Sequence, residues 1–335
     1  MIFIREIEYY LPKNKIDNNA LKKNNANWDI DEISIKTGVQ NRYIAGEDET
    51  SLDLAIVACN KLLSRAKIDK DKIDGLIFCT QSPDYIMPPN SSILHGILGL
   101  KENVFAYDFN LACSGYVYGL AMINGLIESN ILSNVLFINA DTYSKFISDG
   151  DRSTKVLFGD AASVSLIQKS KGSKGVFAFK YSTSGENYNK FIIPAGGMRV
   201  PKSPDTKILR TDRYGNSKSN EKIHMNGMGI FAFVNTKVPK QINALLSENN
   251  LEIKNINLFI FHQASKLAID ALSKILKLDS SKVFTNIELI GNTVSASIPI
   301  AIKDAQDEGL IKENDIILCS GFGVGLSWAS CLIRF

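Results

Sequence analysis

The chain has 335 residues, 45% of them hydrophobic, which is enough to bury a large core in two structural halves. Because only 38 basic residues stand against 35 acidic ones and the charges are scattered, the composition gives no indication of a nucleic-acid partner. No apolar run reaches the ~18 residues of a membrane span. The first residues include Arg5, Glu6 and Glu8, where a secretory signal would be apolar. We therefore expect a cytoplasmic protein without a membrane partner.

The first clear pattern along the chain is an amphipathic helix, a charged turn and a buried strand within residues 55–82. The same pattern returns at 238–265, and a second pair of apolar runs matches residues 134–140 with 315–321. Continuous apolar runs are typical of strands buried on both faces. We interpret the chain as a tandem duplication of an α/β unit, with halves 1–172 and 173–335 packed about a pseudo-twofold axis.

Between the segments 55–82 and 134–140 of the first half, the sequence changes from an apolar strand to a long apolar helix at Cys113. The free N–H groups and the positive end of the helix dipole at a helix start stabilise a thiolate, which is the nucleophilic form of cysteine. The ordinary alternative is a small buried hydrophobe.

The chain has five cysteines, widely spaced and without a CxxC pair, so neither a disulfide framework nor a metal site is predicted. The other four lie within apolar helix or strand patterns, and we interpret them as structural: Cys59, Cys79, Cys319 and Cys331.

Residues 194–222 are rich in Pro, Gly and charge, and they predict a long surface excursion. Loops of this length often cover a site or contact a partner.

Only three histidines occur, and His262 stands between a predicted buried strand and the helix that starts near Ala264. A polar group at this place needs a function or a partner, and a hydrogen-bonded core histidine is the ordinary alternative. His95 and His224 fit structural roles.

The turn 291–299, GNTVSASIP, occupies the position in the second half that Cys113 and its helix occupy in the first. Asn292 is therefore expected to face the same cavity, although Gly-Asn is often only a turn. The glycine-rich segment 321–328 lets the backbone approach a ligand closely.

The chain resembles the β-ketoacyl-acyl-carrier-protein synthase III family of the thiolase superfamily in four segments that occur in the same order: DFNLACSGY, FHQAS, GNTVSASIP and FGVGLSWASCLIRF. Two further segments add to the match, KTGVQNRYIA (36–45) and DRSTKVLFGDAA (151–162). The resemblance implies a thiolase-like fold, in which two duplicated βα halves form a five-layered αβαβα arrangement. It also implies a homodimer, for which the apolar run 103–110 is a candidate contact.

The resemblance makes Cys113 the residue that accepts an acyl group, and His262 and Asn292 the pair that supports decarboxylation and condensation. Backbone N–H groups of Cys113 and of the turn 323–325 are expected to hold the tetrahedral oxyanion. The implied substrates are an acyl-coenzyme A (acyl-CoA) primer and a malonyl-acyl carrier protein (malonyl-ACP), with no permanently bound cofactor and no metal.

For coenzyme A, the family pattern indicates Trp28, Thr37 and Arg152. Lys36 replaces the usual arginine, and it lacks the planar fork that stacks and binds phosphate in two places. Two further departures concern the substrate: Ser265 replaces the usual asparagine, and Met87 stands in the region where a partner subunit's aromatic side chain often closes the acyl pocket.

An acidic carrier protein needs a basic surface beside the tunnel, for which the candidates are Arg210, Arg213, Lys218, Lys222 and Lys266.

Three alternatives stay open at this stage. A relative that transfers the acyl group to an oxygen or nitrogen acceptor would use the same cysteine without decarboxylation. A hydroxymethylglutaryl-coenzyme A synthase needs an acidic catalyst, for which we find no matching Glu. A non-enzymatic scaffold would have no use for Cys113.

Overall fold

The computed structural model describes residues 1–335, and its centre is a mixed sheet of ten strands. From edge to edge the strands lie in the order β14 (Val283–Phe284), β13 (Leu258–Phe261), β15 (Ile316–Gly323), β16 (Ser327–Arg334), β8 (Gly175–Thr183), β1 (Ile2–Tyr10), β7 (Ala161–Lys169), β6 (Asn134–Asp141), β4 (Gly75–Cys79) and β5 (Phe105–Phe109).

The strand order repeats in the two halves of the sheet. In one set it is β1-β7-β6-β4-β5, and in the other it is β8-β16-β15-β13-β14, so β4 corresponds to β13 and β6 to β15. These are the two pairs of segments that the sequence matched. The two sets meet where Ile2 pairs with Val176, and the chain passes from one set to the other between Lys169 and Gly175. We propose that residues 1–172 and 173–335 are the duplicated units.

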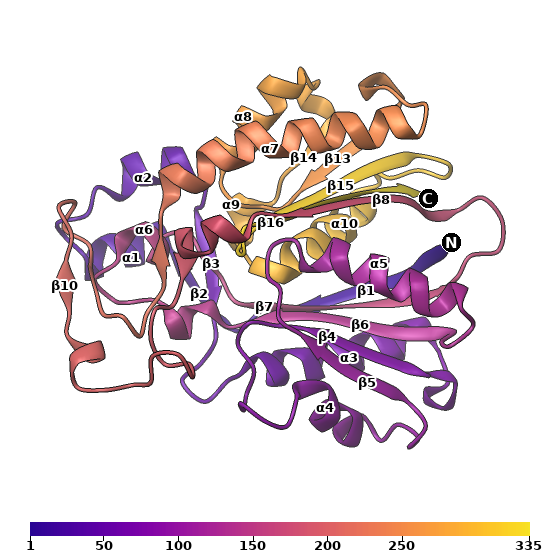
Figure 1. Ribbon diagram of the computed structural model, residues 1–335, viewed down its shortest axis with the longest axis horizontal. Coiled ribbons are helices and arrows are strands. Elements are labelled where there is room, and N and C mark those ends of the chain that lie inside the picture. The colour runs from indigo at the N-terminus through magenta and orange to yellow at the C-terminus, as the bar shows by residue number, and fades with distance from the viewer.

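The helices complete a five-layered arrangement (Figure 1). α3 (Ser51–Ala66) and α4 (Asn90–Leu98) cover the outer face of the first set of strands. α7 (Gly227–Glu248) and α8 (Lys266–Leu276) cover the outer face of the second set. Between the two sets lie α5 (Gly115–Glu128) and α10 (Ser297–Asp307). The predicted fold class is therefore confirmed.

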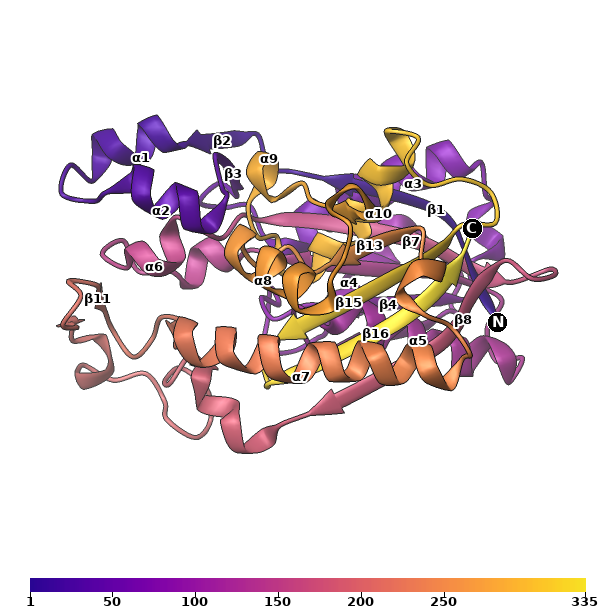
Figure 2. The same cartoon turned by 90° about the horizontal axis from the view of Figure 1, so that it is seen from above.

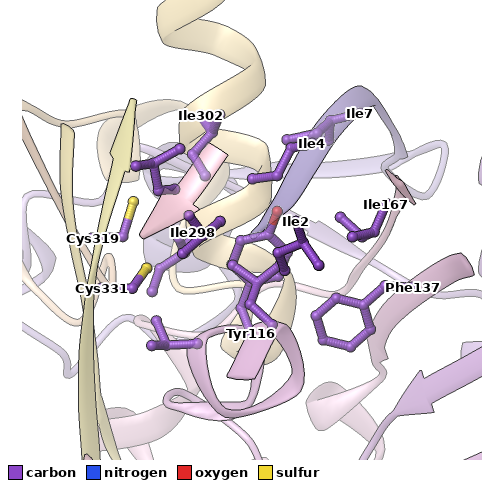
Figure 3. Close-up of a cluster of buried hydrophobic side chains, with 14 of the residues drawn as sticks. Ile2, Ile4, Ile7, Tyr116, Phe137, Ile167, Ile298, Ile302, Cys319 and Cys331 are labelled. Atoms are coloured by element: carbon purple, nitrogen blue, oxygen red, sulfur yellow. The ribbon is translucent and has the colours of Figure 1, made fainter. Parts of the chain in front are cut away.

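The central layer holds the largest cluster of buried apolar side chains, drawn in Figure 3. Tyr116 of α5 stacks on Phe137 of β6, with ring centroids 5.4 Å apart. Ile298 and Ile302 of α10 are fully buried in the same cluster. Since this cluster joins side chains from both sets of strands, the two halves form one continuous core.

The smaller elements gather at one end of the molecule, as both views show (Figures 1 and 2). They are α1 (Asn18–Asn24), α2 (Ile30–Thr37), α6 (Arg152–Lys155), α9 (Ile287–Ile290), β2 (Asn14–Asp17), β3 (Asn41–Ile44), β9 (Phe191–Ile192), β10 (Arg210–Thr211), β11 (Ser217–Lys218) and β12 (His224–Met225). This is the end of the sheet at which Cys113, His262 and Asn292 lie.

The segment 194–222 is a surface excursion, as the sequence predicted. Its tip is the short ribbon of β10 and β11, and Arg210 and Arg213 are exposed. The ribbon is fixed to the body of the protein where Lys218 forms an ion pair of 3.0 Å with the buried Asp151. No helix of the chain combines the length and the apolar character needed to cross a bilayer.

Candidate active site

Three chain segments converge on one cavity of about 580 Å³. Cys113 lies between β5 and α5, His262 directly follows β13, and Asn292 lies between α9 and α10. All three line the cavity. Because α5 and α10 are neighbours in the central layer, their N-terminal ends bring the cysteine of one half to the asparagine of the other.

Cys113 is only 5% exposed, and its sulfur is hydrogen-bonded by the backbone of Val324 and by its own backbone. Both hydrogen bonds lower the pKa of the thiol, as expected at a helix start. Burial has the larger effect, however, and raises the pKa to about 12. The backbone donors at the helix start therefore favour the thiolate, as the sequence predicted, but burial outweighs them and keeps Cys113 a thiol at neutral pH.

Gly323 packs directly against this thiol. A Cβ atom at Gly323 would lie 2.6 Å from the Cys113 sulfur, and one at Gly321 would lie 2.4 Å from the Cys113 carbonyl oxygen. Any side chain at either position collides with the nucleophile's residue. The glycine-rich segment of the sequence is therefore explained by close packing of β15 against Cys113.

His262 is buried, and its ring contacts are few and well defined. Its Nδ1 atom lies 2.6 Å from the Ser297 hydroxyl oxygen, and its ring packs edge-on to Phe322. Burial lowers the pKa of the imidazole to about 3. At neutral pH the ring is therefore uncharged and carries one proton, so that only one of its nitrogens can donate.

Asn292 is buried and lines the cavity. Its Oδ1 accepts a hydrogen bond of 3.0 Å from the Val294 N–H, and its Nδ2 donates to the Ala264 carbonyl across 3.4 Å. Its backbone is fixed by two hydrogen bonds to the first half, with Leu157 and Gly159. The oxygen of the amide is thus occupied and the nitrogen is held by one long bond only, so the nitrogen is available to donate.

Asp141, at the end of β6, is a polar residue of this region that the sequence analysis missed. It is fully buried and accepts hydrogen bonds from the Gln81 N–H (2.8 Å), the Ser295 N–H (3.2 Å) and the Ser295 hydroxyl. Burial raises its pKa to about 7. The carboxyl group joins the first half to the turn that carries Asn292. The sequence did contain a signal for this residue, namely an acidic side chain at the end of an apolar strand.

The residues expected to contact coenzyme A lie at different places. Thr37 and its neighbour Lys36 line the cavity, whereas Trp28 and Arg152 do not. Trp28 is half-buried and packs against a small cluster formed by Leu21, Ile30 and Val156. The Arg152 guanidinium donates a 3.0 Å hydrogen bond to the Tyr214 carbonyl, while the next residue, Ser153, does line the cavity.

The two substitutions relative to the family pattern have clear positions. Ser265 caps α8, accepting a hydrogen bond of 3.2 Å from Ala268, and it also lines the cavity. Met87 is 80% exposed, in the loop after β4.

Most of the basic candidates for carrier binding already have partners within the chain. Lys218 pairs with Asp151 and Lys266 with Asp270. Lys222 donates to a carbonyl oxygen, and Arg213 stacks on Tyr214. Only Arg210 is exposed and has no hydrogen-bond or ion-pair partner.

His95 and His224 each bind a backbone carbonyl, at 2.7 and 3.0 Å, in line with structural roles.

A duplicated five-layered fold with a cysteine at the start of one inner helix, opposite a histidine and an asparagine, defines the class of thiolase-like condensing enzymes. Comparison with known sequences narrows this class. Residues 107–185 match the family described as 3-oxoacyl-[acyl-carrier-protein (ACP)] synthase III, and residues 246–335 match its C-terminal part.

Relatives over the full length agree with this assignment. The chain is 32% identical to the β-ketoacyl-[acyl-carrier-protein] synthase III of Fusobacterium nucleatum, over 100% of this chain and 98% of that protein. It is 35% identical to the enzyme of the same name from Clostridium perfringens, over 97% and 96%.

Solved structures lead to the same family. A crystal structure of a 3-oxoacyl-(acyl-carrier-protein) synthase III superposes with a TM-score of 0.97 at 37% identity, over 100% and 99% of the two chains. The synthase III of Aquifex aeolicus gives a TM-score of 0.86 at 31% identity, with both chains covered completely. The chain belongs to the β-ketoacyl-acyl-carrier-protein synthase III family and is a condensing enzyme of that type.

Proposed function

We propose that the chain transfers an acyl group from an acyl-CoA primer to Cys113 and condenses it with malonyl-ACP, with loss of carbon dioxide. The observation that carries this proposal is that Cys113, His262 and Asn292 line the same cavity. A nucleophile and two hydrogen-bond donors are the groups that the two half-reactions require.

In the first half-reaction, the Cys113 sulfur attacks the thioester carbonyl and forms a new carbon–sulfur bond. The oxyanion is held by the N–H of Cys113 and by N–H groups of the turn 323–325, which packs directly against the sulfur. When the oxyanion collapses, the bond to the coenzyme A sulfur breaks. Coenzyme A leaves with the proton that the Cys113 thiol gave up.

In the second half-reaction, malonyl thioester loses carbon dioxide, and the electron pair of the broken carbon–carbon bond forms an enolate. Its oxygen accepts hydrogen bonds from Nε2 of His262 and Nδ2 of Asn292. Donation from Nε2 requires that Nδ1 be unprotonated, so the Ser297 hydroxyl, 2.6 Å away, is the donor in that contact. The enolate carbon then attacks the acyl carbonyl, and the Cys113 thiolate leaves and is reprotonated.

Coenzyme A binding at the cavity mouth involves Thr37, with Trp28 and Arg152 as outer contacts. This part of the proposal is supported by two residues that line the cavity, Thr37 and Ser153, the second of which directly follows Arg152.

Arg210 is the favoured contact for the acidic carrier protein among the basic candidates, because the other four side chains already have partners.

A homodimer in the cytoplasm is the proposed working form, with β5 as the contact. β5 is an edge strand of the sheet, and Phe105 and Tyr107 expose 42% and 44% of their surfaces beside the exposed Met122 and Ile131. An unpaired apolar edge of this kind favours pairing with a second copy. Tyr107→Lys is expected to give a monomer in light scattering, where the parent chain gives a dimer. A parent chain that is monomeric would contradict the proposal.

Two measurements test the chemistry. Intact-protein mass spectrometry after incubation with acetyl-CoA is expected to show an acyl adduct on the parent chain and none on Cys113→Ala. Malonyl-ACP labelled in its free carboxyl group is then expected to release labelled carbon dioxide. An acyl adduct without this release would instead indicate transfer to an oxygen or nitrogen acceptor.

A further inference from the structure

The turn that carries Asn292 contains a strained backbone position. Val294, two residues after Asn292, has a positive φ of 55°. This left-handed conformation crowds the Cβ atom against the backbone, and a β-branched residue rarely adopts it. Val294 is fully buried, at the start of the short helix η7 (Val294–Ala296). Strain of this kind persists only where the surrounding contacts hold the backbone in place.

The Val294 N–H is the closest hydrogen-bond partner of the Asn292 side chain. It donates to Asn292 Oδ1 across 3.0 Å, whereas the bond from Asn292 Nδ2 to the Ala264 carbonyl spans 3.4 Å. Because the amide group is planar, fixing Oδ1 also fixes the direction of Nδ2. The orientation of the donor therefore depends on the strained position of Val294.

The peptide bond that follows Val294 is held by Asp141, which belongs to the first half of the chain. Both the N–H of Ser295, at 3.2 Å, and its hydroxyl donate to Asp141 Oδ2. The other carboxyl oxygen accepts a 2.8 Å hydrogen bond from the Gln81 N–H, which fixes the carboxyl group to the first half. Asp141 and Ser295 are at most 1% exposed, so water does not compete for these bonds.

The first half-reaction has no use for Asp141. The residue does not line the cavity, so it is not placed to exchange a proton with a substrate. Its negative charge raises the pKa of the Cys113 thiol and thus opposes formation of the nucleophile. The contacts of the carboxyl group lead instead to the turn that carries Asn292.

We propose that Asp141 is a positioning residue for the second half-reaction. Through Ser295 and Val294 it fixes the direction in which the Asn292 amide donates to the enolate oxygen. This inference rests on the proposed function, since it requires that decarboxylation uses the Asn292 amide.

The test compares two rates in each variant, acylation of Cys113 by acetyl-CoA and release of labelled carbon dioxide from malonyl-ACP. In Asp141→Asn we expect acylation at the parent rate or faster, because the charge that opposes ionisation of the thiol is removed. At saturating malonyl-ACP, carbon dioxide release should fall about 10- to 100-fold with little change in KM. Asp74→Asn should keep both parent rates, since Asp74 binds the N–H groups of Ser133 and Asn134 at the opposite end of β6.

A double-mutant cycle tests whether Asp141 acts through Asn292. In the Asn292→Ala background, adding Asp141→Asn is expected to lower carbon dioxide release no further, because the amide to be positioned is absent. Ser295→Ala removes only the hydroxyl donor, so its loss should be smaller and should also vanish in that background. Ser295→Ala carries the same cycle if Asp141→Asn does not fold.

Three results would overturn the inference. They are an equal loss in both half-reactions of Asp141→Asn, carbon dioxide release at the parent rate in both Asp141→Asn and Ser295→Ala, and a full further loss in the Asn292→Ala background. A parent chain that releases no carbon dioxide from malonyl-ACP would refute the proposed function itself.

Discussion

Burial keeps the reacting side chains uncharged in the resting site. The pKa of the Cys113 thiol is raised to about 12, and that of His262 is lowered to about 3. At neutral pH the site therefore contains a thiol and a neutral imidazole. Its chemistry depends on hydrogen-bond donors of fixed direction, and neither a standing ion pair nor a charged acid is needed.

The role of His262 as a donor is tested by His262→Ala. The variant is expected to form the acyl-enzyme at close to the parent rate, because acylation uses backbone donors. Release of carbon dioxide from malonyl-ACP should fall about 10²- to 10³-fold, the usual loss when one such donor is removed. His95→Ala, which changes a histidine bound only to a carbonyl oxygen, serves as the control. Equal losses in both half-reactions would contradict the division of roles.

The raised pKa of Cys113 predicts a specific pH dependence. Below the pKa, the thiolate fraction increases tenfold with each pH unit, and the thiolate is the form that reacts. Alkylation of Cys113 by iodoacetamide should therefore accelerate about tenfold per unit between pH 7 and 9 without reaching a plateau. The rate is measured by mass spectrometry, with Cys113→Ser to subtract the other thiols. A plateau below pH 9 would show that the thiol ionises more readily than its burial implies.

At the scale of the elements, the strand β15 and the start of α5 are fitted to each other at Gly323. Gly323→Ala places a methyl group 2.6 Å from the Cys113 sulfur, so either the strand or the helix start must move. We expect a loss of about 1–3 kcal/mol in the free energy of unfolding, together with slower acylation. Both are measurable, by denaturant titration and by the mass assay.

Gly96→Ala is the matched control for this substitution. Gly96 lies in α4, where an added Cβ meets nothing within 4 Å. Alanine is favoured over glycine inside a helix by roughly 0.5–1 kcal/mol, so this variant should be as stable as the parent or slightly more stable. Equal behaviour of the two variants would mean that the packing at Gly323 is not tight.

The elements themselves were largely predictable, because their signals are local. The apolar runs at 134–140 and 315–321 and the helix–turn–strand repeat gave β4, β6, β13 and β15 their places. The positions of Cys113, His262 and Asn292 followed from where strands give way to helices. What was missed depends on contacts between segments that are distant in the sequence: the hydrogen bond from Ser297 to His262 within the second half, and those from Ser295 to Asp141 of the first half. No local pattern carries such contacts.

The balance of electrostatic effects also could not be predicted from the sequence. The sequence indicated hydrogen-bond donors around Cys113 but not how deeply the thiol is buried, and burial determines the direction of its pKa shift. Similarly, the sequence indicated that Lys218 and Lys222 are available on the surface to bind a carrier protein. In the fold, Lys218 forms an ion pair with Asp151 and Lys222 donates a hydrogen bond to the Lys145 carbonyl. The solvent exposure of a side chain depends on how all layers of the fold pack together, so it cannot be deduced from a local stretch of sequence.

For the whole molecule, the central layer should dominate stability, since it joins the two halves. Ile302 of α10 is fully buried in it (Figure 3). Ile302→Ala is expected to lower the free energy of unfolding by about 2–5 kcal/mol, the range for removing a buried aliphatic side chain. Leu310→Ala, at a position that is 48% exposed, should change it by less than about 0.5 kcal/mol. Similar effects in a urea titration would argue against a shared core.

The placement of α5 and α10 in that central layer has a consequence for how the family can diversify. The nucleophile and its two donors are carried by the most deeply buried helices and strand ends, whose packing tolerates little change. The groups proposed to contact coenzyme A and the carrier, such as Trp28, Arg152 and Arg210, are carried by peripheral loops and short elements. New substrates can therefore be acquired by altering the periphery, while the bond-forming step is inherited unchanged.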